Sequence, residues 1–272
     1  MTTKCSTWGK WHYRTFDGKH FDFYGTCTYA LTKDCQPGSD QFSVHVENDE
    51  ACSDDAETCR RSVILYVNNK AYKVSTGDTV TVDGKFVTLP LKEAGVTIAK
   101  ILSYTVIRAL GNDLEIKFDG HSSIYVGLAE NFRNKTCGLC GNFNGVSQDD
   151  FGMVSGTQAS SANDFGNSWE MVKQGESCSV DTKKSSDVCK NAGDVVWDAA
   201  KRICSVLFEN AFKPCHGKVD PNDFIKKCEQ DVCSCNFTQH SGCACDALTQ
   251  YSRACANVKV TLNWRSKHLC RK

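Results

Sequence analysis

The first part of the chain alternates apolar and polar residues in short runs that are separated by turn residues. Runs at 79–82 and 85–89 flank Asp83-Gly84, and this dipeptide between β-branched runs is the strongest short signal for a hairpin. No sequence repeat and no helical period interrupts the series, so we expect an antiparallel β-sandwich or barrel. The other expected strands are 62–67, 71–74, 104–108, 114–118 and 124–126.

The last third of the chain changes to a helical period. Asp220-Pro221 before 222–225 predicts a helix start, with an aspartate cap and proline in the first turn. This region is therefore expected to be a small helical module whose core is supplemented by disulfides. Apolar residues recur at helical spacing at Val195, Val196, Ala199, Ala200, Ile203, Leu207 and Phe208, and again at Ala247, Leu248, Tyr251, Ala254, Cys255 and Val258.

Charge and cysteine content divide the chain at the same place. Residues 1–178 carry 17 basic and 22 acidic side chains with 8 cysteines, whereas residues 179–272 carry 15 and 10 with 10 cysteines. The two net charges, −5 and +5, cancel over the 272 residues. We expect a β domain at 1–178, a polar linker at 179–188 and a disulfide-rich helical module at 189–272.

Composition also limits the class of protein. A total of 18 cysteines indicates an oxidising, extracellular compartment, and the zero net charge argues against a nucleic-acid partner. No apolar run is long enough to cross a membrane, and the opening residues have no secretory-signal pattern, so we expect a trimmed start. Hydrolase motifs and a phosphate-binding loop are absent, and the seven histidines are scattered.

Cys137-Gly138-Leu139-Cys140 has the spacing of a redox-active pair, which would need a strand before it and a helix after it. The residues that follow, Gly141-Asn142-Phe143-Asn144-Gly145, are typical of a loop instead. Structural disulfides are therefore favoured, with a redox role as the alternative. The pairs Cys233/Cys235 and Cys243/Cys245 are spaced too closely for a typical zinc site and also favour disulfides.

The loop after this motif has the oxygen-rich pattern of a calcium site. Asn142, Asn144 and Val146 alternate, and Asp149 and Asp150 follow. Calcium prefers six to eight oxygen ligands in flexible geometry, and the helices and terminal glutamate of an EF-hand are missing. The alternative is a turn whose Asn and Asp side chains bond their own backbone.

Asn134-Lys135-Thr136 and Asn236-Phe237-Thr238 are N-glycosylation acceptors in a secreted protein.

Several of these segments resemble the von Willebrand factor type D domain. The resemblance rests on three opening segments, on Cys137-Gly138-Leu139-Cys140-Gly141-Asn142-Phe143-Asn144-Gly145, and on a second half that is similar to the eight-cysteine module following type D domains. It covers nearly the whole chain, and the opening segments are most similar in sequence to those of secreted gel-forming mucins. The opening segments are Cys5-Ser6-Thr7-Trp8-Gly9, His12-Tyr13-Arg14-Thr15-Phe16-Asp17-Gly18 and Phe23-Tyr24-Gly25-Thr26-Cys27-Thr28-Tyr29-Ala30-Leu31.

The resemblance implies a calcium site and a disulfide pattern. The implied ligands are Asp17, Asn142, Asn144, the Val146 carbonyl, Asp149 and Asp150. The implied disulfides are Cys5 with Cys140, Cys27 with Cys178, Cys35 with Cys137, and Cys52 with Cys59, which leaves the ten cysteines of the second half open. This chain reads Gly9-Lys10-Trp11-His12 where some relatives cleave themselves at G-D-P-H, and it lacks the trypsin-inhibitor-like module that usually follows.

These observations predict a secreted, calcium-binding, disulfide-stabilised structural and assembly module of a mucin-like or adhesive polymer. Its expected partners are sister type D assemblies, with no nucleic acid and no membrane. The second hypothesis is a ligand-binding module of a matrix or cell-adhesion protein, such as a sperm-adhesion relative or a growth-factor antagonist. Enzymatic activity is not expected; the minor alternative is a redox-active C-x-x-C or an oxidative enzyme similar to secreted luciferases.

Overall fold

The structure is a computed structural model that describes residues 3–48, 60–171, 188–235 and 243–270. The chain forms two compact units, one from residues 1–53 and 58–182 and the other from 54–57 and 183–272. Most of the expected linker at 179–188 lies outside the described residues. Each unit is described by itself below.

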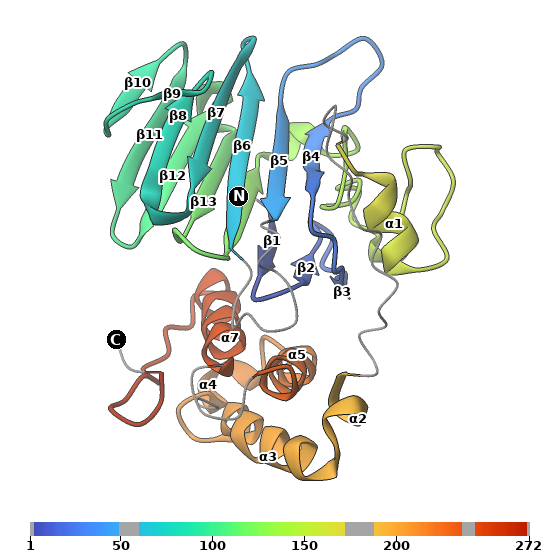
Figure 1. Ribbon diagram of the computed structural model, residues 1–272, viewed down its shortest axis with the longest axis vertical. Helices are drawn as coiled ribbons and strands as arrows, with labels where there is room; N and C mark the ends of the chain where they lie inside the picture. Colours follow the sequence, from blue (N-terminus) through green and yellow to red (C-terminus); the bar gives the residue numbers. More distant parts are fainter. Residues whose placement is uncertain (1–2, 49–59, 172–187, 236–242, 271–272) are drawn as a thin grey trace. The chain divides into compact units, whose positions relative to one another are not determined.

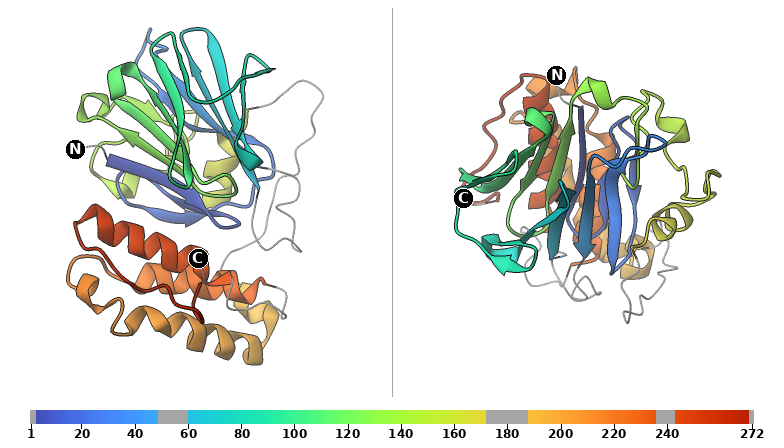
Figure 2. Two further views of the ribbon diagram at one scale, coloured as in Figure 1. Left: turned by 90° about the vertical axis from the view of Figure 1, so that its left-hand side faces the viewer. Right: turned by 90° about the horizontal axis from the view of Figure 1, so that it is seen from above.

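The first unit is a sandwich of two antiparallel sheets (Figures 1 and 2). This confirms the expected mainly β fold. One sheet has eight strands in the order β10-β11-β12-β13-β14-β1-β2-β3, and the other has seven in the order β15-β4-β5-β6-β7-β8-β9. The bounds are β1 Thr3–Trp8, β2 His12–Arg14, β3 His20–Asp22, β4 Thr28–Asp34, β5 Ser43–Asn48, β6 Arg61–Val67, β7 Lys70–Ser75, β8 Thr79–Val82, β9 Lys85–Phe86, β10 Leu91–Glu93, β11 Val96–Ile101, β12 Tyr104–Ala109, β13 Leu114–Phe118, β14 Ile124–Leu128 and β15 Thr136–Cys137.

Local sequence explains most of these hairpins. Asp83 and Gly84 both have positive φ, 49° and 78°, as a tight turn between β8 and β9 requires. Strand β9 ends at Phe86 rather than at the expected residue 89, and Pro90, which has no N–H to donate, lies just before β10. Alternate side chains of both sheets point inward, and Val63, Leu65 and Ile116 lie in one shared core.

A buried arginine holds one end of the sandwich together. Arg61, at the start of β6, is only 1 % exposed. Its Nη1 atom donates to the carbonyl oxygens of Gly9 and Ser122, at 2.8 and 2.7 Å, and its Nη2 atom donates to that of Lys10 at 2.8 Å. Its Nε atom donates to Asn48 Oδ1 at 3.0 Å. One side chain therefore satisfies acceptors from three separate segments of the chain.

A short helix, α1 (Ala162–Ser168), completes the first unit, and Figure 1 shows it beside β4. The Ser161 hydroxyl caps this helix by accepting a hydrogen bond from Asp164 N at 3.1 Å. The segment after the helix runs along β4, where Ala30 N donates to the Trp169 carbonyl oxygen at 2.9 Å.

The second unit is a small helical module, as expected (Figure 2). Asp220 Oδ1 accepts from Asn222 N at 3.0 Å, although the capping residue of α5 is Pro221 rather than the expected Asp220. Phe212, Leu248 and Tyr251 are fully buried in its core. The helices are α2 Val188–Ala192, α3 Asp194–Cys204, α4 Lys213–His216, α5 Asn222–Cys233 and α7 Cys245–Asn257.

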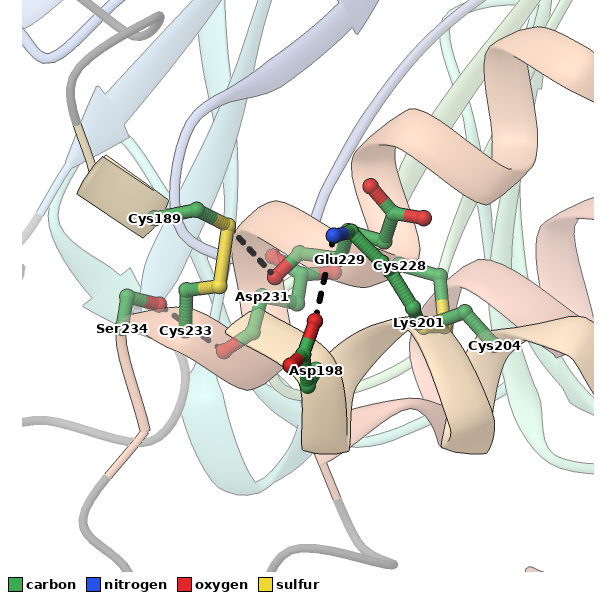
Figure 3. Close-up of a disulfide and its surroundings, with 9 residues drawn as sticks. All are labelled: Cys189, Asp198, Lys201, Cys204, Cys228, Glu229, Asp231, Cys233 and Ser234. Carbon is green, nitrogen blue, oxygen red and sulfur yellow. Dashed lines mark hydrogen bonds and ion pairs between the residues drawn. A yellow bond between two sulfur atoms is a disulfide. The ribbon is translucent and has the colours of Figure 1, made fainter. Parts of the chain in front are cut away.

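All ten cysteines of this module form disulfides within it, which settles the pairing that the sequence leaves open. Figure 3 shows the Cys189–Cys233 bridge, which joins α2 to α5, beside the Cys204–Cys228 bridge, which joins α3 to α5. None of the ten is left for a zinc site or for a link to another chain. The remaining bridges are Cys215–Cys255, Cys235–Cys243 and Cys245–Cys270.

No helix in the described part of the chain combines the length and the apolar character needed to cross a membrane.

Replacing Arg61 by alanine should lower the free energy of unfolding by about 3 kcal/mol or more, because four buried oxygen acceptors lose their donor. Urea denaturation of the two proteins measures this difference. The matched control is Arg60→Ala, at an exposed position, which should change stability by about 0.5 kcal/mol or less. Equal effects of the two substitutions would contradict the role assigned to Arg61.

Candidate functional site

Two disulfides and two backbone hydrogen bonds hold the loop that follows β15. Cys140 is bonded to Cys5 of β1, and Cys137 is bonded to Cys35 just after β4. These are pairs that the family resemblance implies. The backbone N–H of Cys140 donates to the Leu31 carbonyl oxygen at 2.8 Å, and the Cys140 carbonyl oxygen accepts from Phe16 N at 3.0 Å. These bonds fix the loop to both sheets without the help of a ligand.

Because Cys137 and Cys140 have different partners, they are not bonded to each other. The two cysteines of the C-x-x-C sequence therefore belong to two different structural disulfides and do not form a dithiol pair. Cys27 is also disulfide-bonded, whereas Cys52, Cys59 and Cys178 lie outside the described residues.

Asp17 joins the first sequence motif to the second. Its Oδ2 atom accepts a hydrogen bond from Asn144 N at 2.9 Å, and its Oδ1 atom accepts one from Gly145 N at 2.8 Å. Gly145 has a φ of 93°, which glycine adopts without strain. The rings of Phe16 and Phe143 pack beneath this contact, with centroids 5.1 Å apart. Residues more than 120 positions apart thus form one site.

Within the loop, the Asn and Asp side chains bond one another and the backbone. Asp149 accepts from Asn142 Nδ2 at 3.1 Å and from Asn144 Nδ2 at 2.8 Å. Asn142 Oδ1 accepts from Asn144 N at 3.2 Å, and Asn144 Oδ1 accepts from Val146 N at 2.6 Å. These are the local bonds of an Asx-rich turn, the alternative to a calcium site.

Asp150 lies at the bottom of the loop and is 1 % exposed. It accepts from Thr15 Oγ1 at 2.6 Å and from Asn142 N at 3.3 Å. Burial raises the pKa of Asp150 to about 6; the hydrogen bond from Thr15 opposes this shift, and the nearby charges of Asp17 and Asp149 add to it. A β-carbon at Gly141 would lie 2.0 Å from Asp150 Oδ1, so only glycine leaves room for this carboxylate.

The donor set of this site is entirely oxygen. It holds three carboxylates, two amide oxygens and the Val146 carbonyl, a composition that suits a hard cation such as calcium. Within the described part of the chain, none of the three carboxylates forms an ion pair with lysine or arginine. The same described residues contain no group of three or more His, Cys, Asp or Glu side chains placed to hold a metal ion. The residues fit calcium in chemistry, and calcium binding remains a proposal.

Sequence reasoning did not identify three residues of this site. Thr15 lies in the first motif but its bond to Asp150 depends on the way the two motifs meet. Gly141 carries no functional group, and its role is the space that it leaves. Gln158 binds the Asp149 carbonyl oxygen through Nε2 at 2.9 Å, from a segment with no motif.

A cavity of about 390 Å³ lies beside this loop. Asn142, Asp149, Asp150 and both cysteines of the Cys35–Cys137 disulfide are among the residues that line it. Of the two expected glycosylation sites, Asn134 is exposed before β15, and Asn236 lies outside the described residues.

Comparison with known proteins gives two family matches in chain order. The von Willebrand factor type D domain matches residues 5–157, and the C8 domain matches residues 203–271. Von Willebrand factor of Bos taurus is 33% identical over 270 residues, or 98% of this chain and 28% of that protein. Human mucin-2 is 32% identical over 98% of this chain, and human otogelin-like protein is 30% identical over 96%. The chain spans 5% and 11% of these two relatives.

The raised pKa of Asp150 predicts an unusual pH dependence in metal-free buffer. The folded state holds a proton on Asp150 at pH values where the unfolded state has lost it, so stability falls as pH rises from about 4 to about 6. Asp150→Asn should remove this part of the slope. Urea denaturation in EDTA between pH 4 and pH 7 measures it as the difference between the variant and the parent protein. The exposed control Asp40→Asn should keep the parental slope, and a parental slope in Asp150→Asn would contradict the assignment.

Proposed function

The chain belongs to the von Willebrand factor type D domain family, and on this premise we propose that it is a secreted, calcium-binding assembly module of a mucin-like or adhesive polymeric glycoprotein. The observation that supports calcium binding is the contact between Asp17 and the loop at 142–150. This contact joins Asp17 to the loop that carries the other ligands of the proposed set. The relatives' names, von Willebrand factor and mucin-2, support the polymer and the extracellular location.

In this proposal, calcium is held by Asp17, Asn142, Asn144, the Val146 carbonyl, Asp149 and Asp150. Its chemical contribution is charge: a divalent cation would offset three carboxylates that form no ion pair with a lysine or arginine among the residues that the structure describes. The loop's own hydrogen bonds position these oxygens in advance, and Thr15 and Gly141 keep Asp150 in place. The bound loop would stay locked to the β2–β3 turn that carries Asp17.

The assembly role follows from rigidity. Disulfides crosslink each unit internally, so the surface of each unit keeps a fixed shape. Such a surface can pack against sister modules of the same or a related polymer. A glycan on the exposed Asn134 would be consistent with secretion of the protein. We propose no enzymatic activity. The second candidate function is ligand binding in a matrix or adhesion protein, which the cavity beside the loop favours.

Calcium should raise the thermal unfolding midpoint of the protein, because a ligand that binds only the folded state stabilises it by about 2.7 kcal/mol at a hundred times its Kd. Differential scanning calorimetry with increasing calcium after EDTA treatment measures the effect. Asp149→Ala should abolish most of the shift, whereas the exposed control Asp40→Ala should retain it.

A second pair of variants tests the same site without removing a ligand. Gly141→Ala should weaken calcium binding, because its new β-carbon displaces Asp150. Gly156→Ala is the matched control: Gly156 also has a positive φ of 83°, but its β-carbon would meet nothing within 4 Å. No stabilisation of the parent protein by calcium, or an equal shift in Asp149→Ala, would refute the calcium proposal.

The assembly role predicts that the chain self-associates with increasing concentration in calcium, and that EDTA or Asp149→Ala weakens this association. Sedimentation velocity measures the species formed. Asp40→Ala should associate as the parent protein does. A chain that stays monomeric at every concentration, with calcium bound, would contradict the assembly role and favour the ligand-binding function.

A further inference from the structure

The loop of the candidate site contains the one Asn-Gly pair of the chain, Asn144-Gly145. Asparagine is among the chemically labile residues of proteins, and a glycine after it has no side chain to keep its backbone nitrogen away from the asparagine amide. Asn144 is half-buried and Gly145 is exposed, so water reaches the pair. The side-chain amide of Asn144 can therefore be modified here without an enzyme.

We propose that Asn144 is a deamidation site and that the hydrogen bond from Gly145 to Asp17 suppresses its reaction. In the first step Gly145 N loses its proton and attacks Asn144 Cγ. A new C–N bond closes a five-membered succinimide ring, the bond from Cγ to Nδ2 breaks, and Nδ2 leaves as ammonia. Water then adds to one of the two ring carbonyl carbons and opens the ring to an aspartate or an isoaspartate at position 144. The net reaction consumes one water and releases one ammonia, without an oxidant or a reductant.

The peptide group that carries the attacking nitrogen is held on both sides. Its N–H, from Gly145, donates to Asp17 Oδ1 at 2.8 Å, and its carbonyl oxygen, from Asn144, accepts from Arg133 Nη2 at 2.9 Å. Loss of the proton would leave a negatively charged nitrogen against a carboxylate oxygen, which is electrostatically unfavourable. Asp17 thus opposes the first chemical step, and both bonds oppose the rotation of the peptide group that brings its nitrogen to Cγ.

The side-chain amide under attack is held as well. Asn144 Oδ1 accepts from Val146 N at 2.6 Å, and Asn144 Nδ2 donates to Asp149 Oδ2 at 2.8 Å. The second bond depends on the amide, because a carboxylate at position 144 would face the carboxylate of Asp149 without a proton between them. Deamidation would therefore turn an attraction within the loop into a repulsion.

The experiment incubates the whole native chain in mildly alkaline buffer with EDTA. None of these hydrogen bonds requires a metal ion, so the result is independent of the proposed calcium binding. Samples are digested at acidic pH, and mass spectrometry after chromatography measures the aspartate and isoaspartate products at Asn144. The folded protein should react on the order of tenfold or more slower than the same chain in urea, because the loop must open before the ring can close. Equal rates in the folded and unfolded chains would overturn the proposal.

Two variants test the hold on the peptide group. Asp17→Ala should raise the rate at Asn144 severalfold in the folded protein, whereas the exposed control Asp40→Ala should keep the parental rate. Arg133→Ala releases the carbonyl oxygen with every carboxylate in place, and it should also raise the rate at Asn144.

A second asparagine in the same molecule reports on general loss of structure. Asn167 precedes Ser168 in α1, and its rate of deamidation should be the same in the parent protein and in both variants. Parental rates at Asn144 in Asp17→Ala and Arg133→Ala would overturn the proposal. It would also be overturned if both variants raised the rates at Asn144 and Asn167 by the same factor, since unfolding would then explain the reaction.

Discussion

The Cys5–Cys140 disulfide is the constraint on which the first unit and its candidate site both depend. It closes a loop of 135 residues, and in the chain-entropy description such a closure removes about 5 kcal/mol of freedom from the unfolded chain. It also joins β1 of the eight-stranded sheet to the loop that carries the candidate ligands. Because its sulfur atoms are fully buried, the bond is protected by the core that it helps to organise.

The loop attached to this disulfide combines rigid placement with unfavourable charge. The charges of Asp17 and Asp149 help to raise the pKa of Asp150, and none of the three carboxylates forms an ion pair with a lysine or arginine among the described residues. Folding therefore places negative charge where it is costly, and the disulfides and backbone hydrogen bonds keep it there. The calcium proposal rests on this repulsion, because a divalent cation bound between the three carboxylates would offset it.

The hairpins, the division into two modules and the meeting of two distant motifs can all be predicted from sequence, because each depends on local patterns or on a family resemblance. Asp83-Gly84 specifies its turn without help from the rest of the chain. Arg61 could not be predicted as a core residue, since its partners are backbone carbonyls that leave no pattern in the sequence. Thr15 and Gly141 belong to the site for the same reason: one makes a long-range contact, and the other provides space.

The five disulfides of the helical unit have a consequence for its proteolysis. The spans Cys189–Cys233, Cys215–Cys255 and Cys245–Cys270 overlap one another, so together they enclose every peptide bond between residues 189 and 270. A protease that cuts this unit once, at any of those bonds, leaves two fragments that are still covalently joined. Single cuts would then accumulate without releasing fragments, and pieces would separate only after a reductant had opened the disulfides as well.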